Sequence, residues 1–178
     1  SPLTELGQNQ ARQAGAYLKE RGIRFGQLYS STQERASDTL ELISRRTDYT
    51  RLKGIKEWNF GLFEAQPERL QPKFRPGATS FEDLFVPYGG EGVDQVGERM
   101  LVTLTEVMEQ AGAEPVLAVS HGGAMWAFYL KIAAQTLDPK VRFGNCAICH
   151  YHYELGHFKL AEVIDPLTGD VYKCETSL

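Results

Sequence analysis

Apolar residues recur at helical spacing over the first twenty residues of the chain. Thr4, a preferred N-cap residue, stands immediately before this pattern, and Gly22 stands just after it. The pattern therefore predicts an amphipathic helix between these two residues. Its apolar face would consist of Leu6, Ala11, Ala14 and Leu18.

A short strand and a second helix follow. Residues 27–30 have strand character, and the pattern that comes after them is again helical. Ser31 and Thr32 are both suitable N-cap residues for this helix. The sequence thus predicts a strand–turn–helix unit, whose helix would turn inward Ala36, Leu40 and Ile43.

The middle of the chain is less regular. A strand-like piece begins at Arg51, and prolines at positions 67, 72, 76 and 87 then mark a long irregular segment. Long loops in compact domains are usually functional, so this segment is expected to contribute to a site. Residues 89–92 turn the chain into a third predicted helix, whose apolar positions are Val93, Val96, Met100, Leu104, Val107 and Met108.

The clearest local signal is an apolar strand that runs directly into a helix. Residues 116–119 are Val-Leu-Ala-Val, the sequence S-H-G-G follows, and a helix is predicted over 124–134. Residues 147–153 and 158–163 have the pattern of a hairpin. Helices that alternate with buried strands predict an α/β fold, a three-layer α/β/α sandwich. No linker divides residues 1–178, so a single domain is expected.

The composition argues against several classes of protein. With 178 residues, 42% of them hydrophobic, the chain can bury a core of its own, and no cofactor, metal or disulfide is predicted. A formal net charge of −4 without a basic stripe argues against a nucleic-acid partner. No apolar run is long enough for a membrane span. Three cysteines without the spacing of a secreted scaffold favour the reducing cytoplasm.

Two of the predicted helix starts could bind an anion. In open α/β sheets, ligands bind at the C-terminal ends of strands, where helix N-termini present unpaired N–H groups. Arg35 lies in the first turns of one such helix, and His121 and Gly122 stand at the start of the other. Arg35 and His121 could hold a phosphate group from two sides, while Gly122 lets backbone amides approach it. Glu57 could supply a proton to a leaving oxygen.

Five short blocks of the sequence, taken together and in their order along the chain, are more specific than any one of them alone. They are S-P-L-T-E-L-G with Q-A (1–11), L-Y-S-S with Arg35 (28–35), E-W-N-F-G-L-F-E (57–64), G-G-E (89–91) with Arg99, and S-H-G (120–122). In this order the blocks resemble motifs of the histidine phosphatase superfamily, also called the phosphoglycerate mutase-like family. They span positions 1 to 123, and the resemblance implies a phosphoglycerate mutase-like fold.

The resemblance also implies a phosphatase that acts on small phosphate esters through a phosphohistidine intermediate. By position, Arg35 would bind the phosphoryl oxygens, His121 would stabilise their charge in the transition state, and Glu57 would act as acid and then as base. The family's nucleophilic histidine lies in an R-H-G motif upstream of the S-P-L-T block, and no R-H-G occurs in this chain. We therefore expect a chain that is truncated at its N-terminus and inactive as given.

Two alternatives use the same pocket. One is phosphoglycerate mutase-type phosphoryl transfer. The resemblance implies for mutases a large insertion that encloses the substrate, and the stretch 64–88 is only moderate in length. The other is a phosphate-binding pseudoenzyme that has lost its nucleophile. In each case the expected partner is a small-molecule phosphate ester or inorganic phosphate, and the sequence is compatible with a homodimer.

A serine hydrolase is a remote alternative. Residues 118–122 are similar to a nucleophile elbow with Ser120 as the nucleophile. Asp138 or Asp165 could supply the acid, and His150, His152 or His157 the histidine. Arg35 and Glu57 would then have no role, and the chain is short for that fold.

Two further pairs of residues are interpreted as structural. His150 and His152 share one face of a predicted strand, but no placed carboxylate or cysteine completes a metal site. Cys146 and Cys149 are three residues apart on a predicted strand and so point to opposite faces. Buried thiols are expected there rather than a redox or zinc site.

Overall fold

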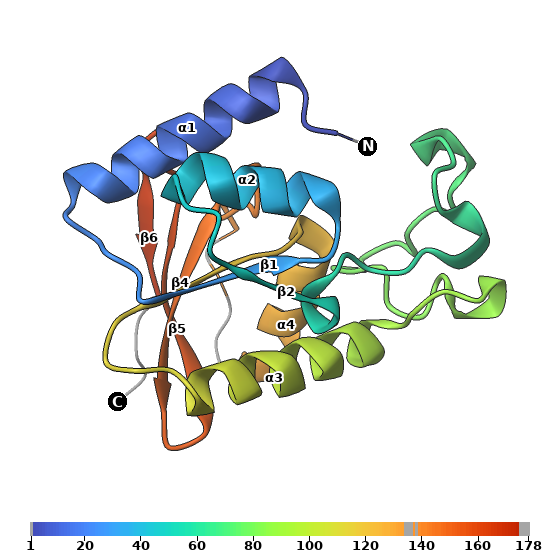
Figure 1. Cartoon of the computed structure of the whole chain (residues 1–178). Helices are drawn as coiled ribbons and strands as arrows, with labels where there is room; N and C mark the ends of the chain where they lie inside the picture. Colours follow the sequence, from blue (N-terminus) through green and yellow to red (C-terminus); the bar gives the residue numbers. More distant parts are fainter. Residues whose placement is uncertain (1, 134–136, 138, 175–178) are drawn as a thin grey trace.

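A computed structural model of the chain describes residues 2–133, 137 and 139–174. Four α-helices and six β-strands form the fold in this part of the chain (Figure 1). In order they are α1 (Glu5–Glu20), β1 (Gln27–Ser31), α2 (Glu34–Ser44), β2 (Thr50–Leu52), α3 (Val93–Glu109), β3 (Val116–Val119), α4 (Gly122–Ile132), β4 (Ile148–Glu154), β5 (His157–Ile164) and β6 (Val171–Lys173). Four 3-10 turns lie between β2 and α3: η1 (Lys53–Ile55), η2 (Gly61–Phe63), η3 (Glu68–Leu70) and η4 (Val86–Tyr88).

The strands form two sheets of three strands each. One sheet is parallel with the order β2-β1-β3, and the other is antiparallel with the order β4-β5-β6. In the parallel sheet, Ser30 is in register with Val119 and Ser31 with Leu52. The C-terminal ends of all three parallel strands therefore lie at one edge, and each leads into a turn or helix.

Helices cover both faces of the parallel sheet. α1 and α2 pack together on one face, and α3 and α4 pack together on the other (Figure 1). This arrangement confirms the three-layer α/β/α prediction. The central core lies on the α3–α4 side and includes Ile55, Trp58, Phe85, Val96, Met100, Ala124, Ala127 and Phe128.

Several predicted details differ from the structure. Thr4 caps α1 as expected, because its side chain accepts the Gly7 N–H, but Leu6 is 66% exposed and not part of the buried face. Neither Ser31 nor Thr32 caps α2, because Gln33 occupies the N-cap without a side-chain cap bond. α4 begins at Gly122, two residues earlier than predicted, and the predicted end at position 134 lies outside the described residues. β6 was not predicted.

α1 and α2 approach each other closely at Gly15. A Cβ atom at this position would lie 2.6 Å from the carbonyl oxygen of Ile43 in α2. We expect Gly15→Ala to lower the free energy of unfolding by about 1–3 kcal/mol in urea denaturation, because overpacking outweighs the higher helix propensity of alanine. Gly112→Ala is the control, since no atom lies within 4 Å of its added Cβ. Equal stability of both variants would contradict the close contact.

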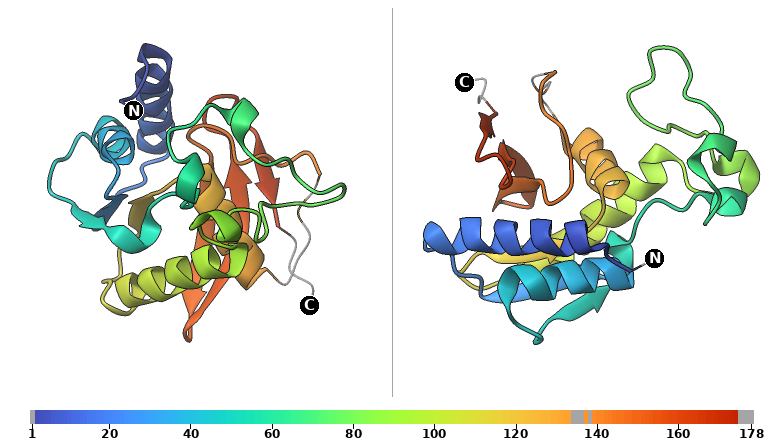
Figure 2. Two further views of the ribbon diagram at one scale, coloured as in Figure 1. Left: turned by 90° about the vertical axis from the view of Figure 1, so that its right-hand side faces the viewer. Right: turned by 90° about the horizontal axis from the view of Figure 1, so that it is seen from above.

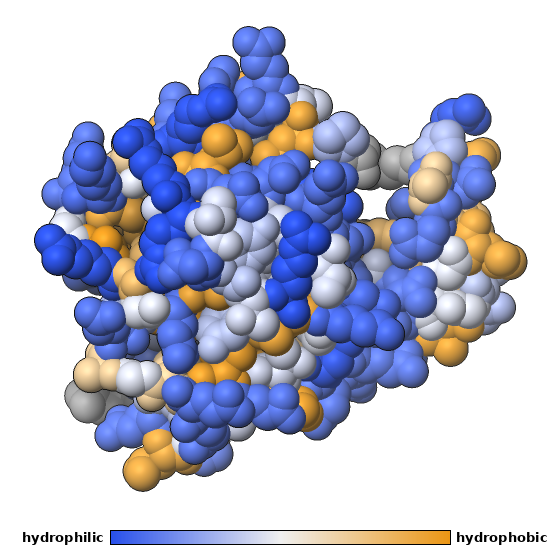
Figure 3. All heavy atoms as spheres, viewed as in Figure 1, coloured by the Kyte–Doolittle hydropathy of each residue, from blue (hydrophilic) through white to orange (hydrophobic). Residues whose placement is uncertain are grey.

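The segment between β2 and α3 projects from one side of the molecule (Figure 2). Its inner side carries interlocking aromatic rings, including Phe60, Phe81 and Phe85. Trp126 of α4 ties the segment down, because its indole N–H donates to the Thr79 carbonyl oxygen at 2.8 Å. Apolar side chains are visible on this segment in Figure 3, and the exposed ones are Leu62, Leu70, Phe74, Val86 and Tyr88.

Among the described helices, none has the length and apolar character that crossing a bilayer demands.

Candidate active site

Arg35, Glu57 and His121 follow the three strands of the parallel sheet. Arg35 is the second residue of α2, after β1. Glu57 follows η1, after β2, and His121 is the N-cap of α4, after β3. Because the C-terminal ends of these strands are in register, the fold gathers at one edge three residues that are far apart in sequence. This edge is the place where open α/β sheets bind ligands.

His121 is held in a buried position at this edge. Its side chain is 7% exposed, and its Nε2 atom lies 2.8 Å from the Ser31 Oγ atom. Burial and the nearby positive charges of Arg35 and Arg99 lower the pKa of His121 from 6.5 to about 3. The imidazole is therefore neutral near pH 7 in the absence of an anion. A neutral ring has one N–H to donate.

This lowered pKa makes stability depend on pH. As the pH falls below about 6.5, His121 takes up a proton in the unfolded chain but not in the folded protein, so the unfolded state gains stability. Between pH 7 and pH 5.5 we expect the free energy of unfolding to fall by about 1 kcal/mol on this account. Urea denaturation at both pH values measures it, and His121→Gln should remove this part of the pH dependence. An unchanged dependence in the variant would contradict the assignment.

Glu57 has one oxygen fixed and the other unbound. Its Oε1 atom accepts hydrogen bonds from the backbone N–H groups of Trp58 and Ala124, each at 2.9 Å. Ala124 lies in the first turn of α4, so the carboxylate also faces the positive end of that helix. No described residue is hydrogen-bonded to Oε2. One oxygen anchors the side chain, and the other is available to give or take a proton.

Gly123 leaves the space that Glu57 occupies. A Cβ atom at Gly123 would lie 2.8 Å from Glu57 Oε1. We expect Gly123→Ala to displace the carboxylate and break its bond to Ala124, so that amide hydrogen exchange at Ala124 becomes at least about 10-fold faster. Gly144→Ala, whose added Cβ meets nothing within 4 Å, should leave that exchange rate unchanged. A slow Ala124 amide in Gly123→Ala would count against the carboxylate anchor.

Ser31 and Gln33 connect His121 with Glu57. The Ser31 Oγ atom accepts the Gln33 backbone N–H at 3.1 Å, and Gln33 Oε1 accepts the Glu57 backbone N–H at 2.9 Å. Glu57 also accepts a hydrogen bond from the first turn of α4, and His121 is the N-cap residue of that helix. The contacts therefore link His121, Ser31, Gln33, Glu57 and the start of α4 in a ring. Ser31 was predicted as a possible helix cap and lies in the L-Y-S-S block, but no contact with His121 was predicted for it. Gln33 had no predicted role, and nothing in the local pattern marks it.

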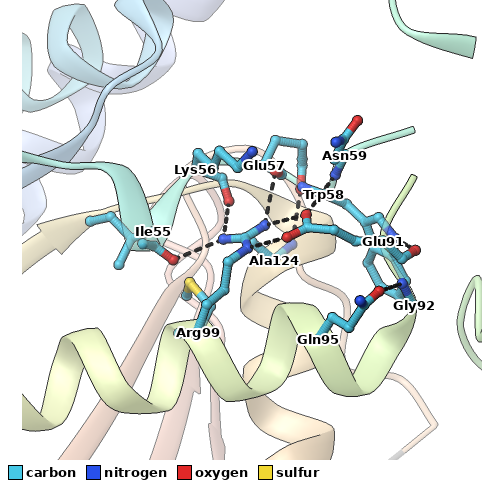
Figure 4. Close-up of polar contacts among 12 residues, drawn as sticks. Ile55, Lys56, Glu57, Trp58, Asn59, Glu91, Gly92, Gln95, Arg99 and Ala124 are labelled. Atoms are coloured by element: carbon cyan, nitrogen blue, oxygen red, sulfur yellow. Dashed lines mark hydrogen bonds and ion pairs between the residues drawn. The ribbon is translucent and has the colours of Figure 1, made fainter. Parts of the chain in front are cut away.

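Arg99 fixes the backbone on the other side of Glu57 (Figure 4). Its guanidinium donates to the carbonyl oxygens of Gly54, Lys56 and Glu57 at 2.8–3.0 Å. It also pairs with both carboxylate oxygens of Glu91, at 2.8 and 3.0 Å. Glu91 Oε2 in turn accepts the backbone N–H of Asn59. The pair therefore braces the segment that carries Glu57.

Partial burial raises the pKa of Glu91, but the bonds from Arg99 and from the Asn59 amide outweigh it. The net effect is a pKa below the usual value for a glutamate. The Glu91 carboxylate is thus held ionised beside the arginine.

Positive charge and free N–H groups meet at the same edge. No described residue forms a hydrogen bond or ion pair with the Arg35 guanidinium, although its backbone carbonyl accepts from Thr39. At the start of α4, the Ala124 and Met125 amides are bonded, whereas those of Gly122 and Gly123 have no partner in the described part of the chain. A guanidinium, a helix N-terminus and a neutral imidazole can together bind a tetrahedral anion. Glu57 can exchange a proton with a group bound there.

The geometry does not support Ser120 as a nucleophile. Its hydroxyl donates to the Ile55 carbonyl oxygen at 2.7 Å, and no histidine side chain among the described residues is hydrogen-bonded to it. Asp138, one of the acids considered with it, lies outside the described residues.

The other flagged residues do not form a metal or redox site. His150 bonds Glu162 at 3.1 Å, and no cluster of three or more metal-ligating side chains occurs among the described residues. The three cysteines are free thiols. Burial raises the pKa of Cys146, and it raises that of Cys149 to about 12, so both are protonated near neutral pH.

Sequence comparisons relate this chain to known proteins. The profile of the histidine phosphatase superfamily (branch 1) matches residues 1–166. A metal-independent phosphoserine phosphatase from Arabidopsis thaliana is 29% identical over 164 residues, which are 84% of this chain and 66% of that protein. A probable phosphoglycerate mutase from Yersinia pestis (strain Pestoides F) is 28% identical over 165 residues, 86% of this chain and 74% of that protein. The chain thus spans slightly less than two thirds of the first relative's length.

Solved structures share the fold at lower sequence identity. Bacillus stearothermophilus YhfR superposes with a TM-score of 0.75 at 23% identity, over 90% of this chain and 83% of that one. A mutant phosphoserine phosphatase from Entamoeba histolytica, in complex with phosphoserine, gives a TM-score of 0.69 at 23% identity, over 91% and 83%.

Proposed function

This chain belongs to the histidine phosphatase superfamily. We propose that it forms most of the catalytic domain of a phosphatase that hydrolyses small phosphate esters through a phosphohistidine intermediate. One observation carries the proposal. Arg35, Glu57 and His121 follow the three parallel strands and meet at one edge of the sheet. The phosphoserine phosphatase relative supports a phosphate monoester as substrate.

In the proposed reaction, a histidine nitrogen attacks phosphorus and the ester P–O bond breaks. Arg35 and the free amides of Gly122 and Gly123 bind the phosphoryl oxygens, and the His121 N–H donates to the charge that develops on them. Glu57 gives its proton to the leaving oxygen. Water then attacks the phosphohistidine, Glu57 takes a proton from that water, and the P–N bond breaks to release phosphate.

No R-H-G occurs in the 178 residues, so the proposal takes the nucleophilic histidine from outside them. We propose that a segment upstream of Ser1 supplies it in the natural protein and that the polypeptide as given is inactive. Hydrolysis of p-nitrophenyl phosphate by this chain, beside a version extended to the natural start codon, tests this. Activity of the extended form alone supports the proposal, and activity of the 178-residue chain would refute it. If neither version hydrolyses p-nitrophenyl phosphate although both are folded, the phosphate-binding pseudoenzyme is favoured.

A mutase is the second candidate, because a probable phosphoglycerate mutase is similar over most of the chain. Transfer of phosphate between the hydroxyls of phosphoglycerate, without release of inorganic phosphate, would identify it. For either enzyme we propose a small-molecule phosphate ester or inorganic phosphate as the ligand and the cytoplasm as the compartment, in keeping with three free thiols. We also propose a homodimer, which sedimentation equilibrium distinguishes from a monomer.

A further inference from the structure

We propose that Ser31 is a positioning residue, which holds His121 in the neutral tautomer with its proton on Nδ1. The inference deepens the proposed function and rests on it, because it assigns which ring nitrogen donates to the phosphoryl group. Ser31 is fully buried at the end of β1, and its Oγ atom lies 2.8 Å from His121 Nε2. One of these two atoms must donate the proton of this bond.

The second contact of Ser31 decides the direction. The Gln33 backbone N–H donates to Ser31 Oγ at 3.1 Å, so this contact cannot accept the hydroxyl proton. The polar atom left within hydrogen-bonding distance of Oγ, among the described residues, is His121 Nε2. If Nε2 carried a proton, the Ser31 hydroxyl proton would be buried without an acceptor, and buried polar groups are almost always paired. The satisfied arrangement has the Ser31 O–H donating to an unprotonated Nε2.

The surroundings keep the ring neutral. Arg35 and Arg99 place positive charge near a buried imidazole, which disfavours a second ring proton. With Nε2 unprotonated, the remaining proton resides on Nδ1. His121 forms no side-chain cap bond to α4, and its Nδ1 has no partner in the described part of the chain. The Nδ1–H is therefore the donor that His121 offers to an anion.

The tautomer is directly measurable in the 178-residue chain. Long-range ¹H–¹⁵N spectra distinguish protonated from unprotonated ring nitrogens, and the signals that disappear in His121→Gln identify this ring among the four histidines. At pH 7 we expect a protonated Nδ1 and an unprotonated Nε2. Ser31→Ala should move the ring toward the Nε2–H tautomer, and Ser31→Thr, which keeps the hydroxyl, should retain the wild-type signals.

Ser37→Ala is the matched control. Its hydroxyl is equally buried, 3.2 Å from that of Ser30, and makes no bond to His121. We expect it to leave the His121 signals in place, so a change common to both variants would indicate general loosening and overturn the assignment. A protonated Nε2 in the wild-type chain would also overturn it, without requiring any variant to fold.

Binding of inorganic phosphate, measured by calorimetry, separates this inference from the proposed function. Ser31→Ala should weaken binding by about 10-fold, since a donor to a charged ligand is lost, while Ser37→Ala should bind as the wild-type chain does. Phosphate binding that is unchanged in Ser31→Ala, despite a changed tautomer, would refute the role of Nδ1 as donor. If the wild-type chain shows the Nδ1–H tautomer but no phosphate binding, the proposed site fails while the tautomer assignment stands.

Discussion

Glu57→Gln, in the version extended upstream to include the nucleophile, should lower kcat/KM for an alkyl phosphate such as O-phosphoserine by about 10²- to 10⁴-fold. The amide keeps a carbonyl oxygen that can still accept the Trp58 and Ala124 N–H groups, so the fold around it should persist. What the variant loses is the proton for the leaving alkoxide. For p-nitrophenyl phosphate the loss should be much smaller, because p-nitrophenolate is a weak base and leaves without a proton.

The contrast between the two substrates is the decisive readout of this experiment. Because kcat/KM covers the steps up to the first irreversible one, it reports formation of the phosphohistidine and not its later hydrolysis. Glu64→Gln is the control, since Glu64 lies in the same segment and its side chain is hydrogen-bonded only to the Phe60 N–H among the described residues. Equal losses of Glu57→Gln on both substrates would show that Glu57 does not act as the acid.

Arg99→Met should lower the free energy of unfolding by about 3–5 kcal/mol. The substitution leaves the mostly buried Glu91 carboxylate without its partner, with both side chains less than one fifth exposed in the intact pair. It also leaves the carbonyl oxygens of Gly54, Lys56 and Glu57 without their donor. Urea denaturation monitored by far-UV circular dichroism measures the change.

An exposed ion pair between α3 and α4 provides the comparison. Lys131 of α4 lies 3.1 Å from Glu98 of α3, next to Arg99 in sequence but at the surface. Lys131→Met should cost less than about 1 kcal/mol, because solvent screens such pairs. Similar losses for the two variants would mean that Arg99 acts as an ordinary surface charge, and the bracing of Glu57 would have to be abandoned.

Local patterns predicted the helices and strands well where one signal dominates. Thr4 and Gly22 bracket α1, and the apolar run 116–119 is β3 itself. Leu6 fits the helical period of α1 but lies in its first turn and is exposed. β6 has only three residues, Val-Tyr-Lys, and no period can be recognised over so short a stretch.

The candidate site was only partly predictable. Arg35, Glu57 and His121 are conspicuous because each follows a strand or belongs to a motif. Gln33 and Arg99 act across 24 and 42 residues of sequence, through bonds to the backbone of Glu57. Bonds to backbone atoms require no particular residue type in the partner, so neither composition nor spacing reveals these contacts. Arg99 was marked only by its place in the G-G-E block, without a predicted role.

The division of the strands into two sheets bears on how the molecule assembles. In the antiparallel sheet, β4 and β5 are joined by the two-residue turn Leu155–Gly156, whereas in the parallel sheet Gln27 pairs with Val116, 89 residues later in the sequence. No ladder of hydrogen bonds joins the two sheets within the described residues. The antiparallel sheet can thus form early from neighbouring segments, while the parallel sheet, and the edge where Arg35, Glu57 and His121 meet, must wait for distant segments to come together. Amide hydrogen exchange would then show the two sheets as separate cooperative units. The three candidate site residues would all belong to the parallel sheet, which forms last.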